Sequence, residues 1–121
     1  MRTLLAFEDD YRAYAYALAA AISAAHPRLA VTTIGLEALQ TEVTRLDPHL
    51  VICSLPNPAT PEQEGRLSWV KLSVDPHQPS KFCLNGQRWE SLNPSLEELL
   101  GVVEETERLL LRSSSQRSEA C

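Results

Sequence analysis

Apolar and polar residues follow one another in blocks along the first half of the chain, and the blocks have the lengths of strands and helices. Two unbroken apolar runs, residues 3–7 and 49–54, predict strands buried on both faces. A run rich in β-branched residues, 29–34, predicts a strand between them. Apolar residues at helical spacing over residues 11–25 and 36–46 predict two helices. The pattern therefore indicates a βαβαβ unit with parallel strands.

The first predicted helix has an apolar stripe and recognisable ends. Asp10 is expected to cap its start, and Pro27 follows its end. The alanine-rich composition favours close packing against a sheet. The stripe expected to face that sheet consists of Tyr14, Leu18, Ala21, Ile22 and Ala25.

The second half of the chain has a different pattern. Residues 56–65 are rich in proline and predict a loop, and residues 67–74 predict a fourth strand. Asn85-Gly86 is a strong signal for a two-residue turn, so residues 81–90 are expected to form a β-hairpin. The segment between Val74 and Lys81 is too short for a parallel crossover, which needs a dozen or more residues. An antiparallel part of the sheet is therefore predicted here.

A long final helix is predicted after the hairpin. Asn93 and Pro94 form its expected start, and the polar residues 113–121 are expected to be a disordered tail. The expected architecture is a three-layer α/β domain, residues 1–112, with a parallel N-terminal half and an antiparallel hairpin followed by a long helix. Its apolar helix positions are Leu96, Leu99, Leu100, Val103, Leu109 and Leu110.

Composition and charge argue against some classes of function. Hydrophobic residues make up 44% and charged residues 22% of the chain, as in an ordinary globular protein. The formal net charge of −5 argues against binding to nucleic acid. Neither a leader pattern nor an apolar run long enough to span a membrane is seen, so a cytoplasmic location without membrane binding is expected. The three cysteines form no CxxC pair typical of a zinc or redox site.

The order of three motifs carries a family resemblance. An apolar strand ends in Phe7-Glu8-Asp9-Asp10, residues 35–39 read Gly-Leu-Glu-Ala-Leu, and residues 47–52 read Asp-Pro-His-Leu-Val-Ile. In order and spacing the chain resembles the receiver domain of two-component response regulators, a CheY-like, flavodoxin-like fold. The resemblance covers about the first 56 residues, together with the start of the last helix.

The resemblance implies roles for particular residues. Glu8 and Asp9 match the acidic pair that holds Mg²⁺ in the family, but Ser54 occupies the place of the aspartate that accepts the phosphoryl group. A hydroxyl cannot form an acyl phosphate. Ser73 matches the hydroxyl residue of the fourth strand, and Asn85 falls nearest to the family's lysine after the fifth strand. The chain thus resembles a degenerate receiver with a vestigial site at Glu8, Asp9, Ser54 and Ser73.

The residues also have simpler explanations. Acidic residues after a strand favour the start of the following helix, so Glu8 and Asp9 need not bind metal; a weak Mg²⁺ site at these two residues is left open, and no cofactor is expected. Ser54 lacks the G-x-S-x-G sequence of a nucleophile elbow, so no catalytic residue is assigned. The two tryptophans, Trp69 and Trp89, are expected to contribute one core residue and one of undecided role.

Two hypotheses follow. The first is a non-enzymatic, phosphorylation-independent pseudo-receiver that acts in signalling or regulation through a protein partner, with homodimerisation at the hairpin edge as a further expectation. The alternative is a domain that binds a small molecule or a metal, with minor enzymatic activity left open, at the carboxyl ends of the parallel strands. Glu8, Asp9, Ser54 and Asn57 would converge there.

Overall fold

The strands and helices belong to the described part of the chain. The structure is a computed structural model that describes residues 1–54, 68–73, 75 and 77–112. The predicted loop 56–65, Asn57 and the predicted tail 113–121 lie outside these residues. Within them the strands are β1 (Arg2–Phe7), β2 (Ala30–Gly35), β3 (Leu50–Ser54), β4 (Ser68–Leu72), β5 (Ser80–Leu84) and β6 (Gln87–Ser91), and the helices are α1 (Arg12–Ala25), α2 (Leu39–Leu46) and α3 (Leu96–Arg112).

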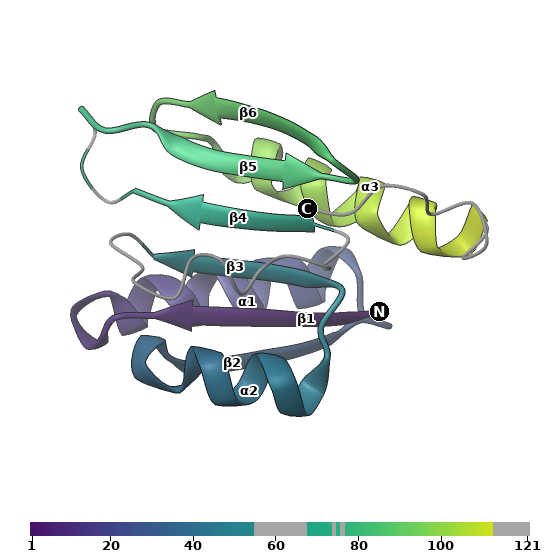
Figure 1. Ribbon diagram of the computed structural model, residues 1–121, viewed down its shortest axis with the longest axis horizontal. Helices are drawn as coiled ribbons and strands as arrows, with labels where there is room; N and C mark the ends of the chain where they lie inside the picture. Colours follow the sequence, from purple (N-terminus) through teal and green to yellow (C-terminus); the bar gives the residue numbers. More distant parts are fainter. Residues whose placement is uncertain (55–67, 74, 76, 113–121) are drawn as a thin grey trace.

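The described strands form one mixed sheet in the order β2-β1-β3-β4-β5-β6 (Figure 1). The neighbours β2, β1, β3 and β4 are parallel, whereas β5 runs antiparallel to β4 and β6 antiparallel to β5. The predicted hairpin is confirmed, because β5 and β6 meet at Asn85 and Gly86, with φ of 51° and 90°. Both positive angles fit the type I′ turn that suits a two-residue hairpin.

Helices cover both faces of the sheet and bury two apolar clusters. α1 and α3 pack on the face that includes Leu5 and Ile52, whereas α2 packs on the face that includes Leu4 and Val51. These four strand residues have no exposed surface. Because side chains alternate along a strand, the unbroken apolar runs of β1 and β3 serve both faces at once. The expected three-layer α/β arrangement is therefore present.

The start of α1 differs from the expectation. Asp10 does not cap the helix, since Asp9–Tyr11 form a short 3₁₀ turn and Tyr11 stands at the cap position without a side-chain bond. Residues Ala15, Leu18 and Ile22 form the buried stripe. Tyr14 is 48% exposed instead of lying in the core. Ala15 therefore faces the sheet in place of Tyr14.

The start of α3 also differs. Asn93 has a positive φ of 48° and precedes the helix, while the amide of Glu98 donates to Ser95 Oγ at 3.1 Å. Ser95 is therefore the N-cap, and the expected start at Asn93 and Pro94 is wrong. Leu96 is largely exposed, and Leu99, Val102 and Val103 face the core.

A buried hydroxyl pair links α3 to the middle of the sheet. The hydroxyls of Ser68 on β4 and Thr106 on α3 are 2.7 Å apart, and Thr106 Oγ1 also lies 2.7 Å from the Val102 carbonyl oxygen. Ser68 and Thr106 have no exposed surface. Because an unpaired buried hydroxyl is costly, the pair fixes the position of the helix on the strand.

Candidate functional site

The carboxyl ends of the parallel strands bring three of the predicted site residues to one edge of the sheet. β1 and β3 are paired so that Ala6 lies beside Cys53, which places the end of β1 next to Ser54. Ser54 in turn pairs with Leu72, the last residue of β4. Glu8, Ser54 and Ser73 therefore gather at the edge where open parallel sheets usually place their sites.

Ser54 is built into the backbone of this edge. Its side chain has no exposed surface, and its Oγ accepts a hydrogen bond from the amide of Glu8 at 3.1 Å. Glu8 follows the last residue of β1, so its amide is outside the hydrogen-bonded part of the strand. Ser54 Oγ provides the acceptor for this amide. A buried hydroxyl with this partner is held as a structural acceptor, and solvent does not reach its oxygen.

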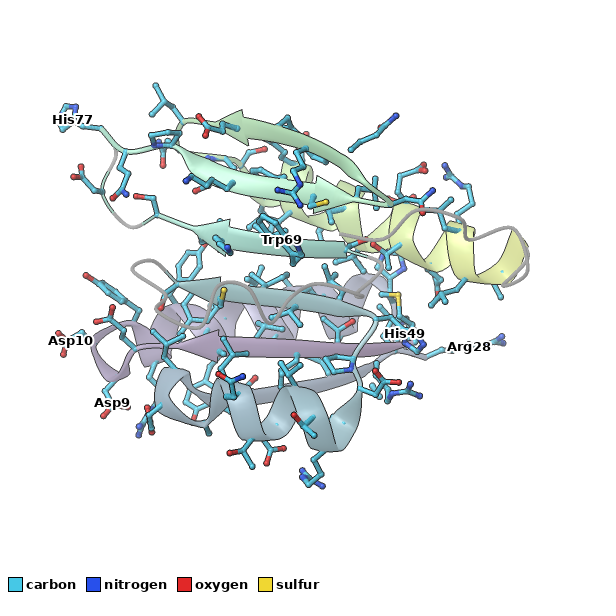
Figure 2. The ribbon with its side chains drawn as sticks, in the orientation of Figure 1. Asp9, Asp10, Arg28, His49, Trp69 and His77 are labelled. Carbon is cyan, nitrogen blue, oxygen red and sulfur yellow. The ribbon has the colours of Figure 1, made fainter. Side chains whose placement is uncertain are left out.

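Asp9 and Asp10, which follow β1 and Glu8, point outward. Asp9 Oδ1 accepts a hydrogen bond from the Arg12 guanidinium at 2.8 Å, and the Asp9 side chain is 72% exposed. Figure 2 shows Asp9 and Asp10 projecting from the turn into solvent. Exposed pairs of this kind contribute about 0–1 kcal/mol. Among the residues that the structure describes, no three His, Cys, Asp or Glu side chains form a group that could hold a metal ion.

Ser73 shapes the turn that leads from β4 to β5. Its Oγ donates to the Asp75 carbonyl oxygen at 3.0 Å and accepts from the Asp75 amide at 3.1 Å. Its own amide donates to Ser80 Oγ at 2.9 Å. The buried Ser80, which sequence reasoning passed over, therefore holds the two ends of the turn together.

Asn85 lies far from the other site residues along the strands. Leu84, the residue before it, pairs with Ser68 at the start of β4, whereas Ser54 pairs with Leu72 at the end of β4. Asn85 therefore lies at the amino-terminal edge of the parallel strands. The match of Asn85 to the family's lysine is wrong in space, because β5 runs in the reverse direction.

A pocket of about 290 Å³ opens beside this edge, on the face covered by α1. The Phe7 and Tyr14 rings are tilted against each other with centroids 5.7 Å apart. Burial against the pocket wall raises the pKa of the Tyr14 phenol. Sequence reasoning assigned Tyr14 to the core and so missed this pocket. Its lining residues are Phe7, Tyr11, Tyr14, Leu72, Ser73, Asn93 and Pro94.

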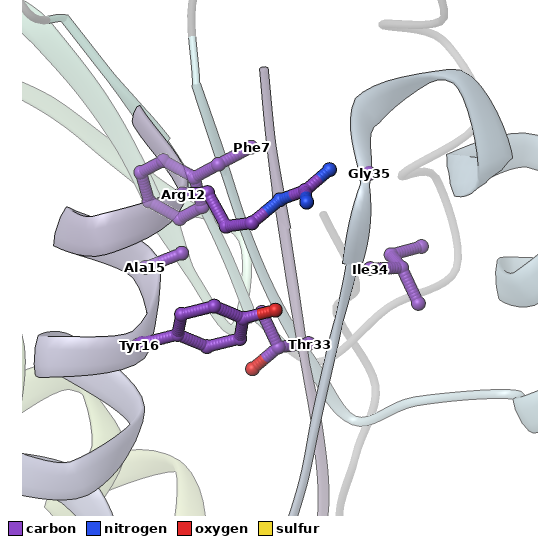
Figure 3. Close-up of a pocket in the computed structure, with 7 residues that line it drawn as sticks. All are labelled: Phe7, Arg12, Ala15, Tyr16, Thr33, Ile34 and Gly35. Carbon is purple, nitrogen blue, oxygen red and sulfur yellow. The ribbon is translucent and has the colours of Figure 1, made fainter. Parts of the chain in front are cut away.

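A second, smaller pocket of about 110 Å³ lies between the first turns of α1 and the end of β2 (Figure 3). Arg12 extends from α1 towards Gly35, and the hydroxyl end of Tyr16 points towards Thr33. The side chains of Phe7 and Ala15 form its inner wall. Its volume would accommodate only a few atoms of a ligand.

The sheet face that packs against α2 carries a cationic and aromatic cluster on β4 and β6. Lys71 is 4% exposed, and its Nζ lies 4.4 Å from the centroid of the Trp69 ring. The Arg88 guanidinium lies 5.9 Å from the same ring. Both cations are placed for attraction to the negative face of the indole. Trp69 is buried, and Figure 2 shows it in the middle of the sheet. It is the core tryptophan of the two, a choice that the sequence left open.

Trp89, the second tryptophan, packs on the other face of the sheet. Its ring stacks on Phe82 with centroids 5.0 Å apart and an interplanar angle of 7°. It is half-buried against the core beneath α3. Part of Trp89 is therefore exposed at the outer strand of the described sheet.

Comparison of the chain with protein-family models, curated proteins and solved structures finds no match. Within the described residues, none of the helices is both long enough and apolar enough to span a membrane. The class that the fold defines is thus an α/β protein, whose described residues form a mixed sheet of six strands. The receiver resemblance remains a prediction made from the residues.

Proposed function

We propose that this chain is a phosphorylation-independent pseudo-receiver, a non-enzymatic domain that acts in regulation through contact with a protein partner. The hydrogen bond from the Glu8 amide to the buried Ser54 Oγ is the observation that carries the proposal. In the receiver family the same place holds the aspartate that forms an acyl phosphate. A buried serine that already satisfies a backbone amide has neither the carboxylate nor the access for that reaction.

The surroundings of Ser54 support the same proposal. The family's cation is held by acidic residues after the first strand, but the exposed Asp9 is engaged with Arg12. Asn85, the residue that the resemblance matches to the family's lysine, lies at the other end of the sheet from Ser54, because β5 runs in the reverse direction. A scaffold that retains the parallel half and lacks these groups is suited to binding another protein rather than to cycling through phosphorylation.

The proposal is tested by adding Mg²⁺ and then beryllofluoride or acetyl phosphate to the ¹⁵N-labelled chain. We expect the amide resonances of Glu8, Asp9 and Ser54 to stay unchanged at every concentration. A phosphorylatable receiver treated in parallel shows that the reagents are active. Saturable shifts confined to these three residues would overturn the proposal.

A second candidate function is favoured by the pocket beside α1. Its aromatic wall of Phe7, Tyr11 and Tyr14, together with the polar groups of Ser73 and Asn93, suits a small ligand that has an aromatic or apolar body and a few polar atoms. The volume of about 290 Å³ lies near the lower end of ligand pockets. This function would make the carboxyl edge of the sheet a binding site.

Thermal-shift screening separates the two candidates, because a ligand that binds the folded state raises Tm by mass action. A ligand of the pocket should lose its effect in Tyr14→Ala. Tyr16→Ala, which changes the wall of the smaller pocket, is the matched control and should retain the shift. A library without any Tyr14-dependent shift would count against ligand binding and leave the pseudo-receiver as the proposal.

A further inference from the structure

β6 is the last strand in the order of the described sheet. Within the part of the chain that the structure describes, β6 pairs only with β5. The two-residue turn fixes which backbone groups face outward. Leu84 and Gln87 flank the turn and form a hydrogen-bonded pair, so the next such pairs are Phe82 with Trp89 and Ser80 with Ser91.

The outward backbone groups of β6 therefore belong to Arg88 and Glu90. In an antiparallel ladder, hydrogen-bonded and non-bonded pairs alternate, and the residues of non-bonded pairs direct their N–H and C=O groups to the other side. Arg88 and Glu90 are both exposed. Each presents one donor and one acceptor, which a further strand can satisfy.

The charges at these two positions select one partner and one register. An antiparallel copy of β6 centred on Trp89 places Arg88 opposite Glu90 of the copy and Glu90 opposite Arg88 of the copy. In a register centred on Arg88 or on Glu90, like charges lie opposite each other. In a register shifted by one residue, the outward N–H and C=O groups of one β6 face residues of the copy whose N–H and C=O groups point towards β5. The register centred on Trp89 alone combines complete hydrogen bonding with opposite charges.

The central pair of this register is also favourable. The two Trp89 residues would form a non-hydrogen-bonded pair, in which side chains of neighbouring strands lie closest. Each ring already has one side on Phe82 and is half-buried. Contact between the two rings would cover more of their apolar surface.

We propose that two copies of this chain form a homodimer by antiparallel pairing of β6 with β6, centred on Trp89. The sequence Arg88-Trp89-Glu90 is self-complementary about its middle residue, so one short segment provides both halves of a twofold interface. The two six-stranded sheets become one continuous sheet across the twofold axis. This assembly is independent of whether the chain is a pseudo-receiver, and its test does not involve Ser54.

The test measures the association of the full chain by sedimentation velocity, from about 1 µM to about 1 mM. The wild type should dimerise within this range. Arg88→Glu and Glu90→Arg each place like charges opposite each other twice in the dimer, and each should raise the dissociation constant about tenfold or more. An equimolar mixture of the two variants restores opposite charges at both positions and should form a heterodimer.

A double variant and a distant variant complete the design. Arg88→Glu combined with Glu90→Arg reverses both charges, keeps the complementarity and should dimerise like the wild type. Arg28→Glu makes the same change of charge at an exposed residue away from β6 and should leave the dimer intact (Figure 2). Amide exchange gives a second readout, since the amides of Arg88 and Glu90 should become protected as concentration rises, while that of Trp89 is protected throughout.

Three results would overturn the proposal. A wild type that stays monomeric at the highest concentration would mean that the charges protect the edge against pairing. Single variants that associate as tightly as the wild type would place the interface elsewhere. Failure of the mixed variants to associate, with both variants folded by circular dichroism, would reject the register centred on Trp89.

Discussion

Ser54 shows how a single residue ties the turn after β1 to the sheet. Its Oγ accepts the Glu8 amide at 3.1 Å, and the serine is completely buried. An aspartate in its place would bring a charge into a buried site, and burial of a charge is unfavourable unless several partners compensate it. The serine is therefore suited to a structural function at this position.

Ser54→Ala is expected to lower the free energy of unfolding by about 1–2 kcal/mol, because the Glu8 amide loses its acceptor in a partly buried place. Urea unfolding followed by fluorescence measures the change. Ser23→Ala removes an exposed hydroxyl from α1 and is the control, with an expected change within about 0.5 kcal/mol. A Ser54→Ala protein as stable as the wild type would show that the bond contributes nothing.

Tyr14 gives a pH-dependent prediction. Burial raises the pKa of its phenol above the ordinary 10.0. The unfolded chain therefore loses this proton first, so the associated stability is complete below pH 10.0 and is lost as the pH rises through the higher pKa of the folded state. Tyr14→Phe has no such proton, and its stability should fall less at alkaline pH.

Urea unfolding of the wild type and Tyr14→Phe at about pH 8 and about pH 10.5 measures this difference. Ser23→Ala changes no ionisable group and should follow the wild type. Equal alkaline losses in the wild type and Tyr14→Phe would contradict burial of the phenol in the pocket.

At the scale of elements, the β5–β6 hairpin depends on its turn. Gly86 has a φ of 90°, a conformation that costs a residue with a side chain about 1–2 kcal/mol. Gly86→Ala should therefore destabilise the protein by about that amount. Gly101 lies inside α3, and an added Cβ there meets no atom within 4 Å. Gly101→Ala should stabilise the protein by about 0.5–1 kcal/mol.

The two glycine variants make a matched pair, because the same methyl group is added in both and the expected signs are opposite. Thermal unfolding is sufficient to measure both. If both variants changed the stability in the same direction, the turn and the helix would tolerate a side chain equally well. That result would contradict the positive φ of Gly86.

The elements that the sequence predicts well are those fixed by local chemistry. The Asn85-Gly86 turn and the double-sided strands β1 and β3 follow from residues next to one another in the chain. The helix starts were wrong because caps compete within a few residues. Asp10 and Asn93 are good caps by type, but the 3₁₀ turn at Asp9–Tyr11 and the hydroxyl of Ser95 determine where α1 and α3 begin.

In the candidate site, too, the sequence predicts the features that local patterns and strand pairing determine, and it misses the others. Parallel pairing predicts that Glu8 and Ser54 meet, and they do so through the amide and the hydroxyl. The outward direction of Asp9 depends on Arg12, one turn along the chain, and on the 3₁₀ entry to α1. The pocket around Tyr14 joins residues from α1, β1, β4 and the segment before α3, and no local pattern contains that combination.

At the scale of the whole molecule, one apolar cluster joins the parallel and antiparallel halves. It includes Leu5 and Ile52 from the parallel strands, Phe82 from β5 and Leu99 from α3. β3 and β4 continue the sheet between the halves over five paired residues. If one half unfolded, the apolar residues that the other half contributes to this cluster would become exposed to water. Residues 1–112 are therefore expected to unfold as one unit.

Two probes placed in different halves test this expectation. The two tryptophans, Trp69 and Trp89, lie in β4 and β6, so their fluorescence reports the hairpin and the parallel strand β4 beside it. The amide resonances of Leu4 and Leu5 report β1. We expect both signals to change at the same urea concentration, because the shared cluster would lose its apolar contacts in a single step. Resonances of Leu4 and Leu5 that persist after the fluorescence change is complete would show that the parallel half folds without its antiparallel extension.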